Sequence, residues 1–333
     1  MKGKGIGRLV EELTASGYGS RLQFDEPMAR HTSFAIGGPA DVLVVVDALS
    51  DLVHLVRAAQ ACDVPCLVLG GGTNILVADA GVRGLVVVNR CRGYRIDDGG
   101  YVVAESGVLL HELAHWAVRE GWAGLEWAVG IPGTLGGAVV GNAGAYGGTV
   151  SDRLHAVRLL RLNGQEETVE ARDLDYGYRT SALKREAGNG YRSVVLEAVL
   201  QLERGDAEEL AVRAAHVAEQ RRLRTPRGSC AGSVFKRTPQ YPAGFLIEQA
   251  GLKGRRIGGA VVSEKHANFL LNTDRATAAD MHALITLVQD EVWSAFGQRL
   301  EPEIEYIGDW SRASARVAGG AERKSRYNAA VGS

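Results

Sequence analysis

The sequence predicts a mixed fold of helices and strands (α+β) in three consecutive parts, and three observations support this. Apolar runs of strand length alternate with helical stretches from residue 40 to residue 202. The pair Gly205-Asp206 then interrupts the pattern, and a long, charged, alanine-rich helix is expected at 207–224. With 333 residues, the chain is long enough for two or three domains with substantial cores.

The first part, residues 20–96, has the alternating pattern of an α/β lobe. The apolar runs have the length of strands, whereas the helical stretch is longer and mixes polar with apolar positions. Three consecutive glycines, Gly70 to Gly72, follow one of the strands and predict a tight loop there. The expected elements are a strand at 42–46, a helix at 49–61, and strands at 66–69, 75–77 and 85–88.

The second part, residues 97–205, is expected to be another lobe, and the third, residues 206–309, a smaller α/β domain. The third part ends with a helix at 278–296 and a strand-like run at 303–307. Residues 310–333 are small, polar and basic with little periodicity, so we expect a disordered tail. The second part has expected strands at 101–104, 154–162 and 193–202 and an expected helix near 109–120.

Charge and composition exclude several classes of function. The 38 Lys and Arg residues nearly balance the 39 Asp and Glu residues, so the chain lacks the broad positive surface that binds nucleic acid or an anionic membrane. The N-terminus has no secretory signal and the apolar runs are of strand length, which predicts a cytoplasmic protein. The four cysteines contain no CxxC pair and are too sparse for a disulfide framework. We expect free thiols, no metal site and a monomer.

Glycine is concentrated at two places. The chain has 43 glycines, about 13% of its residues against a usual usage of about 7%. Eight of them fall between residues 130 and 148, in addition to the run after residue 69. Neither GxGxxG nor GxxxxGK[ST] occurs, which argues against a Rossmann or P-loop site. The loops at 69–74 and 130–137 can still present backbone N–H groups to a pyrophosphate, with close packing as the structural alternative.

One motif predicts different chemistry. Residues 111–115 read His-Glu-Leu-Ala-His and fit HExxH, in which two histidines on one helical face bind zinc. No third histidine follows at metzincin spacing, and no acidic residue stands in a second helix about twenty positions on. Such patterns arise by chance in amphipathic helices, so surface histidines are the preferred interpretation. A zinc peptidase built on His111 and His115 is a remote second interpretation.

Nine segments in order along residues 20–308 together resemble the UDP-N-acetylenolpyruvoylglucosamine reductase (MurB) family. Each segment alone is a weak signal, but the ordered set is specific. The sequence departs from the family pattern at His31, at Ala35 and at Arg237-Thr238, none of which removes a catalytic group. The segments are 31–41, 70–74, 124–148, 176–181, 231–236, 251–254, 257–260, 265–268 and 301–304.

The resemblance implies a two-lobed FAD-binding domain of the vanillyl-alcohol-oxidase-like (PCMH-type) fold, followed by the smaller substrate domain. It also implies that NADPH reduces FAD and that the reduced FAD then reduces UDP-N-acetylglucosamine enolpyruvate to UDP-N-acetylmuramate, in peptidoglycan precursor synthesis. The short span between Arg179 and Ser233 resembles the second type within the family. Two rival functions are an FAD-dependent oxidase of the same fold and a nonenzymatic protein that binds a nucleotide-sugar.

Three catalytic residues follow from the resemblance. Ser233 matches the proton donor, and Arg179 and Glu303 match the pair that polarises the substrate. Hydride addition to the terminal vinyl carbon leaves negative charge spread toward the carboxylate, which a fixed cation and a hydrogen-bonding acid stabilise. Ser233 then protonates the neighbouring carbon, which must be strongly basic because a hydroxyl is a weak acid.

The resemblance also implies which residues bind the cofactor and the substrate. Small residues suit close contact with a flavin nucleotide. Tyr178, Lys236, Lys253 and His266 are candidates for binding the substrate. The expected flavin contacts are Gly70, Gly71, Gly72, Thr73, Asn74, Gly130, Ile131, Pro132, Gly133, Gly136, Gly137, Asn142 and Ala143.

Overall fold

The computed structural model describes residues 2–186 and 192–310, in two compact units. Except for Trp310, the expected tail at 310–333 lies outside the described residues. Both units combine segments that are far apart in the sequence. Of the described residues, unit 1 comprises 2–26, 41–72, 84–186 and 192–225, and unit 2 comprises 27–40, 73–83 and 226–310.

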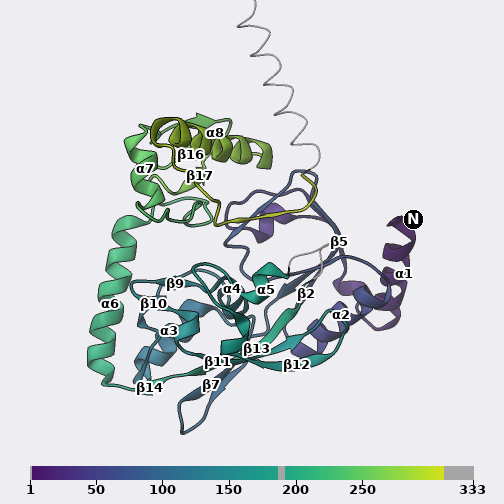
Figure 1. The fold of residues 1–333 in the computed structure, drawn as a ribbon. Coiled ribbons are helices and arrows are strands. Elements are labelled where there is room, and N and C mark those ends of the chain that lie inside the picture. The colour runs from purple at the N-terminus through teal and green to yellow at the C-terminus, as the bar shows by residue number, and fades with distance from the viewer. Residues whose placement is uncertain (1, 187–191, 311–333) are drawn as a thin grey trace, which may run out of the picture. The chain divides into compact units, whose positions relative to one another are not determined.

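The largest sheet of unit 1 has five antiparallel strands in the order β12-β11-β13-β7-β6 (Figure 1). Alternate residues of β7 are buried, as expected for a strand with one face on a core. The sheet forms part of a large apolar core of unit 1. Its strands are β6 (Tyr94–Ile96), β7 (Tyr101–Glu105), β11 (Leu154–Leu160), β12 (Glu166–Glu170) and β13 (Val194–Gln201).

Three helices accompany this sheet. Helix α3 (Leu110–Arg119) buries Leu113 and Ala117, four residues apart on one face, and α6 (Ala207–Arg224) lies beside it (Figure 1). The side chain of Asp206 caps α6 by accepting from the N–H groups of Glu208 and Glu209. Helix α4 (Leu135–Gly141) packs against β13 and occupies the glycine-dense region.

A four-stranded sheet of unit 1 has the order β1-β2-β5-β3, with β3 and β5 parallel. Leu52 and Leu55 of helix α2 (Leu49–Ala61) are buried in its core. Helix α1 (Lys2–Ala15), which the sequence analysis did not predict, adds Leu9 and Leu13 to the same core. The strands are β1 (Gln23–Pro27), β2 (Pro39–Val46), β3 (Cys66–Leu69) and β5 (Val82–Asn89).

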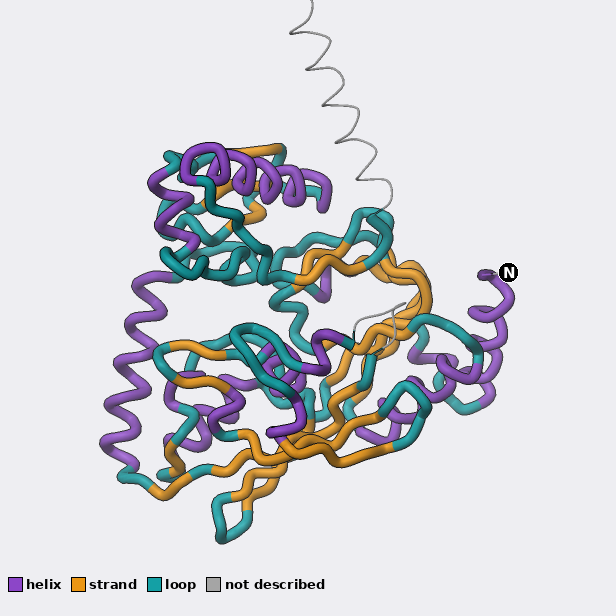
Figure 2. Tube along the Cα trace, viewed as in Figure 1, coloured by secondary structure: helices purple, strands orange, loops and turns teal. Residues whose placement is uncertain are grey.

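Unit 2 contains helices α7 (Ala243–Gln249) and α8 (Ala278–Phe296), which lie beside short strands in Figure 2. Phe34 and Leu76, from earlier in the chain, are buried in the same core as these helices. The strands are β15 (Arg256–Ile257), β16 (Ala260–Val262) and β17 (Leu270–Asn272) in one antiparallel sheet, and β4 (Ile75–Val77) with β18 (Glu305–Ile307) in a parallel pair.

A carboxylate fixes one early segment of unit 2 to the C-terminal part of the chain. Asp79 accepts hydrogen bonds from the backbone N–H groups of Ala278 (2.8 Å) and Ala279 (3.0 Å), at the start of α8. A negative charge is favourable there because helix N-termini carry unpaired N–H donors.

The remaining helix and strands are short. They are β8 (Trp122–Ala123) paired with β14 (Glu203–Arg204), β9 (Gly144–Ala145) paired with β10 (Gly148–Thr149), and α5 (Ala182–Arg185).

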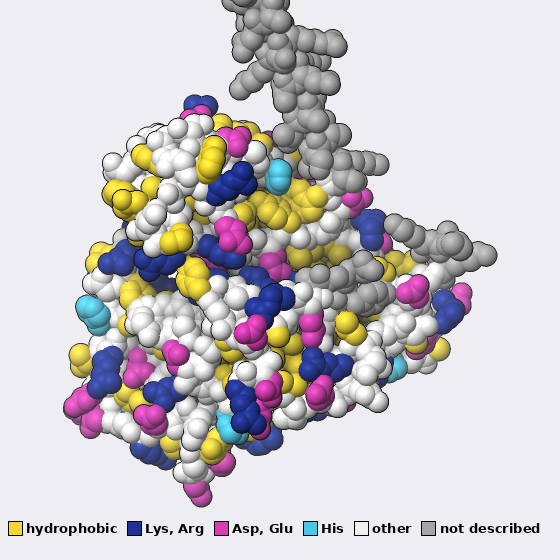
Figure 3. All heavy atoms as spheres, viewed as in Figure 1, with side chains coloured by type: hydrophobic (Ala, Val, Ile, Leu, Met, Phe, Trp, Pro, Cys, Tyr) yellow, Lys and Arg dark blue, Asp and Glu magenta, His cyan; other side chains and the backbone are white. Residues whose placement is uncertain are grey.

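The surface matches the near-neutral composition. Basic and acidic side chains are interspersed on the face drawn in Figure 3. Among the residues that the structure describes, no helix combines the length and apolar character needed to cross a membrane.

Candidate active site

The two glycine loops predicted to contact a flavin meet within unit 1. Gly70 follows β3 directly, and a Cβ atom at this position would lie 2.2 Å from Oγ1 of Thr134. Gly133 is fixed from a third segment, because its carbonyl accepts a hydrogen bond from the N–H of Leu110 (3.1 Å). Only glycine fits at position 70, and the reason is the contact between the loops.

The first backbone N–H groups of α4 have hydrogen-bond acceptors within the protein. The N–H groups of Leu135 and Gly136 donate to the carbonyls of Val108 and Ser106, both at 2.8 Å. The N–H of Gly137 points to Oγ1 of Thr134 at 3.5 Å. A Cβ on Gly136 would also lie 2.8 Å from Cβ of Ser106. Gly136 is therefore required by packing, and the first N–H groups of α4 are already engaged.

Other glycines leave room and donors for a ligand. Within the described residues, the N–H groups of Gly71 and Gly72 donate no hydrogen bond, and Gly72 has a left-handed φ of 60°. A Cβ on Gly137 would meet only Oγ1 of Thr134, at 3.7 Å. Adjacent N–H groups in a left-handed turn suit a phosphate, and bare backbone suits a flat ring system. These residues fit FAD.

An arginine that the sequence analysis did not select supports the second loop. Arg221 on α6 donates to the carbonyls of Val129 (3.2 Å) and Trp127 (3.4 Å), and its Cδ would lie 3.1 Å from a Cβ on Gly130. Burial lowers the pKa of this guanidinium. Of the other predicted residues in this region, Ile131 packs partly buried against the unit 1 core and Pro132 is exposed.

Arg179 occupies a tight turn in unit 1. Gly177 and Thr180 exchange two backbone hydrogen bonds (3.1 and 3.3 Å), which leaves Tyr178 and Arg179 at the tip. Arg179 has a left-handed φ of 57°, which is unusual for a residue with a side chain. Its guanidinium carbon lies 5.6 Å from the ring centre of Tyr178, whose side chain is exposed. Asn142, at the end of α4, donates to the carbonyl of Gly177 (3.1 Å).

Ser233 and Glu303, 70 positions apart, lie on neighbouring segments of unit 2. The N–H of Glu303 donates to the carbonyl of Val234 (2.7 Å), and the N–H of Lys236 donates to the carbonyl of Glu301 (2.9 Å). This short antiparallel pairing is centred on Phe235 and Pro302. Backbone pairing therefore brings together two of the three residues predicted to be catalytic, while Arg179 belongs to unit 1.

Two asparagines hold this pair of segments. The side-chain amide of Asn74 donates to the backbone carbonyl of Glu303 (3.1 Å). The backbone carbonyl of Asn74 accepts from the N–H of Glu305 (2.9 Å). The Asn268 amide pairs with both backbone groups of Phe235, through Nδ2 (2.8 Å) and Oδ1 (2.9 Å). The sequence analysis predicted a flavin contact for Asn74, and it gave no role to Asn268. A buried amide side chain that pairs in this way leaves no sequence signal beyond its presence in a motif.

The candidate substrate residues of unit 2 are mostly engaged with neighbours. Lys236 forms an ion pair with Glu301 (2.7 Å), and Lys253 forms one with Glu248 (2.6 Å). The Nδ1 atom of His266 accepts from the N–H of Asn268 (3.2 Å). These contacts orient the side chains within unit 2.

The HExxH motif lies on α3, where Leu113 and Ala114 face the core and His115 is exposed. Glu112 lies 3.9 Å from a guanidinium nitrogen of Arg92. No cluster of three or more His, Cys, Asp or Glu side chains suited to a metal occurs in the described part of the chain. The helix that carries the motif is amphipathic, with Leu113 and Ala114 on its buried face.

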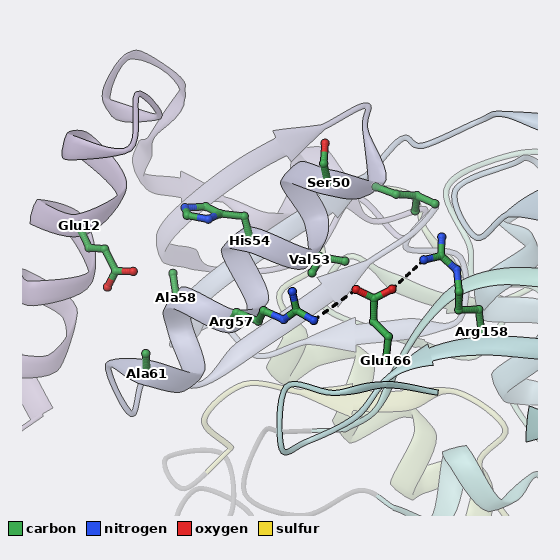
Figure 4. Close-up of a pocket in the computed structure, with 10 residues that line it drawn as sticks. Glu12, Ser50, Val53, His54, Arg57, Ala58, Ala61, Arg158 and Glu166 are labelled. Atoms are coloured by element: carbon green, nitrogen blue, oxygen red, sulfur yellow. Dashed lines mark hydrogen bonds and ion pairs between the residues drawn. The ribbon is translucent and has the colours of Figure 1, made fainter. Parts of the chain in front are cut away.

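A cavity of about 630 Å³ lies elsewhere in unit 1, between α1, α2 and the strands β11 and β12 (Figure 4). Both of its arginines form ion pairs, because Glu166 accepts from Arg57 (3.2 Å) and from Arg158 (2.7 Å). No predicted catalytic, flavin or substrate residue lines it. Its lining is Glu12, Leu49, Ser50, Val53, His54, Arg57, Ala58, Ala61, Arg158 and Glu166.

Comparison with known proteins identifies relatives over nearly the whole chain. Residues 224–307 match the family model of the UDP-N-acetylenolpyruvoylglucosamine reductase C-terminal domain, and residues 40–170 match an FAD binding domain. The reductase of that name from Caldanaerobacter subterraneus is 42% identical over 302 residues, 90% of this chain and 98% of the relative. The one from Synechococcus is 42% identical over 294 residues, 87% and 92% of the two chains.

A solved structure agrees with these matches. The crystal structure of the reductase (MurB) from Thermus caldophilus aligns with a TM-score of 0.74 and 34% identity, over 86% of this chain and 99% of that one. These comparisons confirm an FAD-binding domain followed by a separate C-terminal domain, and they confirm FAD as the cofactor. The chain therefore belongs to the UDP-N-acetylenolpyruvoylglucosamine reductase family.

Proposed function

We propose that the chain catalyses the NADPH-dependent reduction of UDP-N-acetylglucosamine enolpyruvate to UDP-N-acetylmuramate, as its family membership indicates. Bound FAD would supply the hydride transfer from NADPH to the terminal vinyl carbon of the substrate. The observation that supports this most is the backbone pairing of residues 234–236 with 301–303, which holds Ser233 and Glu303 on adjacent segments.

Ser233 is assigned the proton transfer. Hydride addition makes the carbon next to the carboxylate strongly basic, so even a weakly acidic hydroxyl can protonate it when it is well positioned. Arg179 and Glu303 are assigned the stabilisation of the charge that develops on the carboxylate side. The left-handed φ of Arg179 suits a functional role, because strained backbone concentrates at such sites.

Unit 1 is assigned most of the cofactor site. The N–H groups of Gly71 and Gly72 would hold the pyrophosphate of FAD, and the open surface at Gly137 would lie along it. In unit 2, Lys236, Lys253 and His266 are assigned to the anionic groups of the substrate. Lys236 is paired with the exposed Glu301, and Lys253 with the exposed Glu248. Tyr178 is assigned to the substrate beside Arg179.

We place this reaction in the cytoplasm, with the chain acting as a monomer. We also propose a functional division of the chain into two lobes, at 20–96 and 97–205, and a substrate domain at 206–309. In this division, the two lobes bind FAD and the last domain binds the nucleotide-sugar.

An absorbance experiment tests the proposal. The purified protein is kept anaerobic, and spectra are recorded before NADPH, after NADPH and after UDP-N-acetylglucosamine enolpyruvate. We expect a flavin band that bleaches with NADPH and returns with the substrate. A flavin that is reduced by an alcohol and consumes oxygen without NADPH would favour an oxidase. A band that bleaches with NADPH but does not return with the substrate would contradict the assigned reaction.

A further inference from the structure

The turn that carries Arg179 is fastened to the C-terminal end of α4 by side chains. The hydroxyl of Tyr176 donates to the carbonyl of Val139 (3.0 Å), and the hydroxyl of Ser181 donates to the carbonyl of Val140 (2.6 Å). The last carbonyls of a helix have no partners within it, so they are natural acceptors for such anchors. Both anchors lie within three residues of Arg179, one on each side of it.

A third anchor comes from α4 itself. The Asn142 amide donates through Nδ2 to the carbonyl of Gly177 (3.1 Å) and accepts through Oδ1 from the N–H of Ser151 (3.2 Å). These two partners fix which end of the amide is oxygen and which is nitrogen. Asn142 also ends the helix with a left-handed φ of 44°, and it is 7% exposed.

The three anchors surround a backbone conformation that the chain disfavours. A side chain at φ 57° is strained, and such a conformation persists only where the surroundings hold it. Two backbone hydrogen bonds between Gly177 and Thr180 close the turn, and the anchors join the closed turn to α4. The direction in which the Arg179 side chain leaves the backbone therefore depends on the end of α4.

Helix α4 links this turn to the flavin loops. It has seven residues, so its two ends are only about 10 Å apart along the axis. Its start is packed against Ser106 and its cap, Thr134, touches Gly70. A single short element thus carries the predicted flavin contacts at one end and the support of Arg179 at the other.

We propose that Tyr176, Ser181 and Asn142 are positioning residues that hold Arg179 in its left-handed conformation on α4. The same helix then sets the geometry of the flavin loops and of the guanidinium. This inference rests on the role of Arg179 in the proposed function. It gives Asn142 a task beyond the flavin contact expected from the sequence.

Tyr176→Phe and Asn142→Gly test the proposal. The first removes one hydroxyl and keeps the ring, and the second removes the amide while glycine still accepts φ 44°. Ser181→Ala is less informative, because it also removes the cap that accepts from the N–H of Lys184. Flavin reduction by NADPH, flavin reoxidation by the substrate, FAD content and thermal stability are measured separately.

We expect reoxidation by the substrate to slow about 10- to 100-fold in both variants, because small misplacements of a catalytic group have effects of this size. In Tyr176→Phe, reduction by NADPH and FAD content should stay near those of the unmodified chain. Asn142 is also an expected flavin contact, so for Asn142→Gly only the rate of reoxidation by the substrate, measured on protein saturated with FAD, tests the positioning role. Tyr101→Phe is the matched control, since the Tyr101 hydroxyl makes no hydrogen bond among the described residues. Asn163→Gly is the second control, since its amide bonds Gln165 twice in a remote hairpin.

A double-mutant comparison separates positioning from general damage. In an Arg179→Ala background, Tyr176→Phe and Asn142→Gly should slow reoxidation no further, because the group that they position is gone. Unchanged reoxidation in the single variants, an equal loss in both half-reactions of Tyr176→Phe, or full additivity with Arg179→Ala would overturn the proposal. If Arg179→Ala by itself reoxidises normally, the role of Arg179 in the proposed function is the statement that fails.

Discussion

Unit 1 and unit 2 hold their proposed catalytic side chains by different means. In unit 1, Arg179 stands on a strained turn that side chains fasten to the end of a helix. In unit 2, Ser233 and Glu303 lie on two extended segments joined by backbone hydrogen bonds. Backbone pairing tolerates most side chains, whereas anchors of the first kind depend on particular residues. The two regions should therefore respond differently to substitution.

The largest expected effect concerns the chemistry assigned to unit 2. Ser233→Ala removes the proton donor, and we expect reoxidation of the flavin by the substrate to slow by about 10²- to 10⁴-fold. Reduction by NADPH should change little, because that step needs no proton from Ser233. Rapid-mixing absorbance of the two half-reactions measures both rates, with Ser50→Ala as the control, since Ser50 is exposed and lines the separate cavity of unit 1. An equal loss in both half-reactions would contradict the assigned role.

The fold and the reaction class were largely predictable from the sequence. Strands and helices of unit 1 follow hydrophobic periodicity, which is a local property, so α2, β3 and α3 lie where the pattern indicated. The family and its cofactor followed from ordered motifs and are confirmed by the comparisons. Helix α1 was missed because its residues, 2–15, include glycines and charges that weaken the helical pattern.

The support of the candidate site was not predictable, because it depends on contacts between distant segments. Asn268 meets Phe235 across 33 positions, and Asn74 meets Glu303 across 229. An asparagine in a motif has the same appearance in the sequence whether it binds a cofactor or a backbone. Likewise, nothing local in the sequence reveals that Gly70 is needed because Thr134 fills the space of its Cβ.

One side chain that supports the paired segments of unit 2 is the amide of Asn268, which bonds both backbone groups of Phe235. Asn268→Ala leaves the N–H and the carbonyl of the buried Phe235 without their partner, at a cost of about 1–3 kcal/mol for each group. We expect a lower free energy of unfolding, measured with urea, and slower reoxidation by the substrate. Asn268→Asp keeps the acceptor and loses the donor, so it should also destabilise the protein. Unfolding midpoints equal to those of the unmodified chain would show that the backbone pairing alone is sufficient.

Two glycines of α4, in unit 1, distinguish a glycine required by packing from one that leaves room for the cofactor. Gly136→Ala places a methyl group 2.8 Å from Cβ of Ser106, and overpacking of this kind costs about 1–3 kcal/mol. Gly137→Ala meets only an ordinary contact at 3.7 Å, so the stability of the FAD-free protein should stay the same or increase. If Gly137 faces the flavin, FAD affinity should fall in this variant alone. Unfolding of the FAD-free proteins and FAD titration distinguish the two effects, and equal stabilities would contradict the packing argument.

The smallest expected effect is a pH dependence that arises in unit 2. His282 packs against the rings of Tyr306 (5.4 Å) and Trp310 (5.3 Å), and burial lowers the pKa of its imidazole below the usual 6.5. Burial also raises the pKa of Tyr306 to about 12, so that ring stays neutral in this range. Below about pH 6.5 the unfolded chain takes up a proton that the folded chain resists, so folding stability is full above that pH and falls as the pH decreases. We expect His282→Gln to reduce the loss of stability between pH 7.5 and lower pH, measured by urea unfolding at several pH values. Other groups titrate as well, so the test compares how steeply the free energy of unfolding changes with pH in the two proteins. Equal pH dependence would show that His282 is not the group responsible.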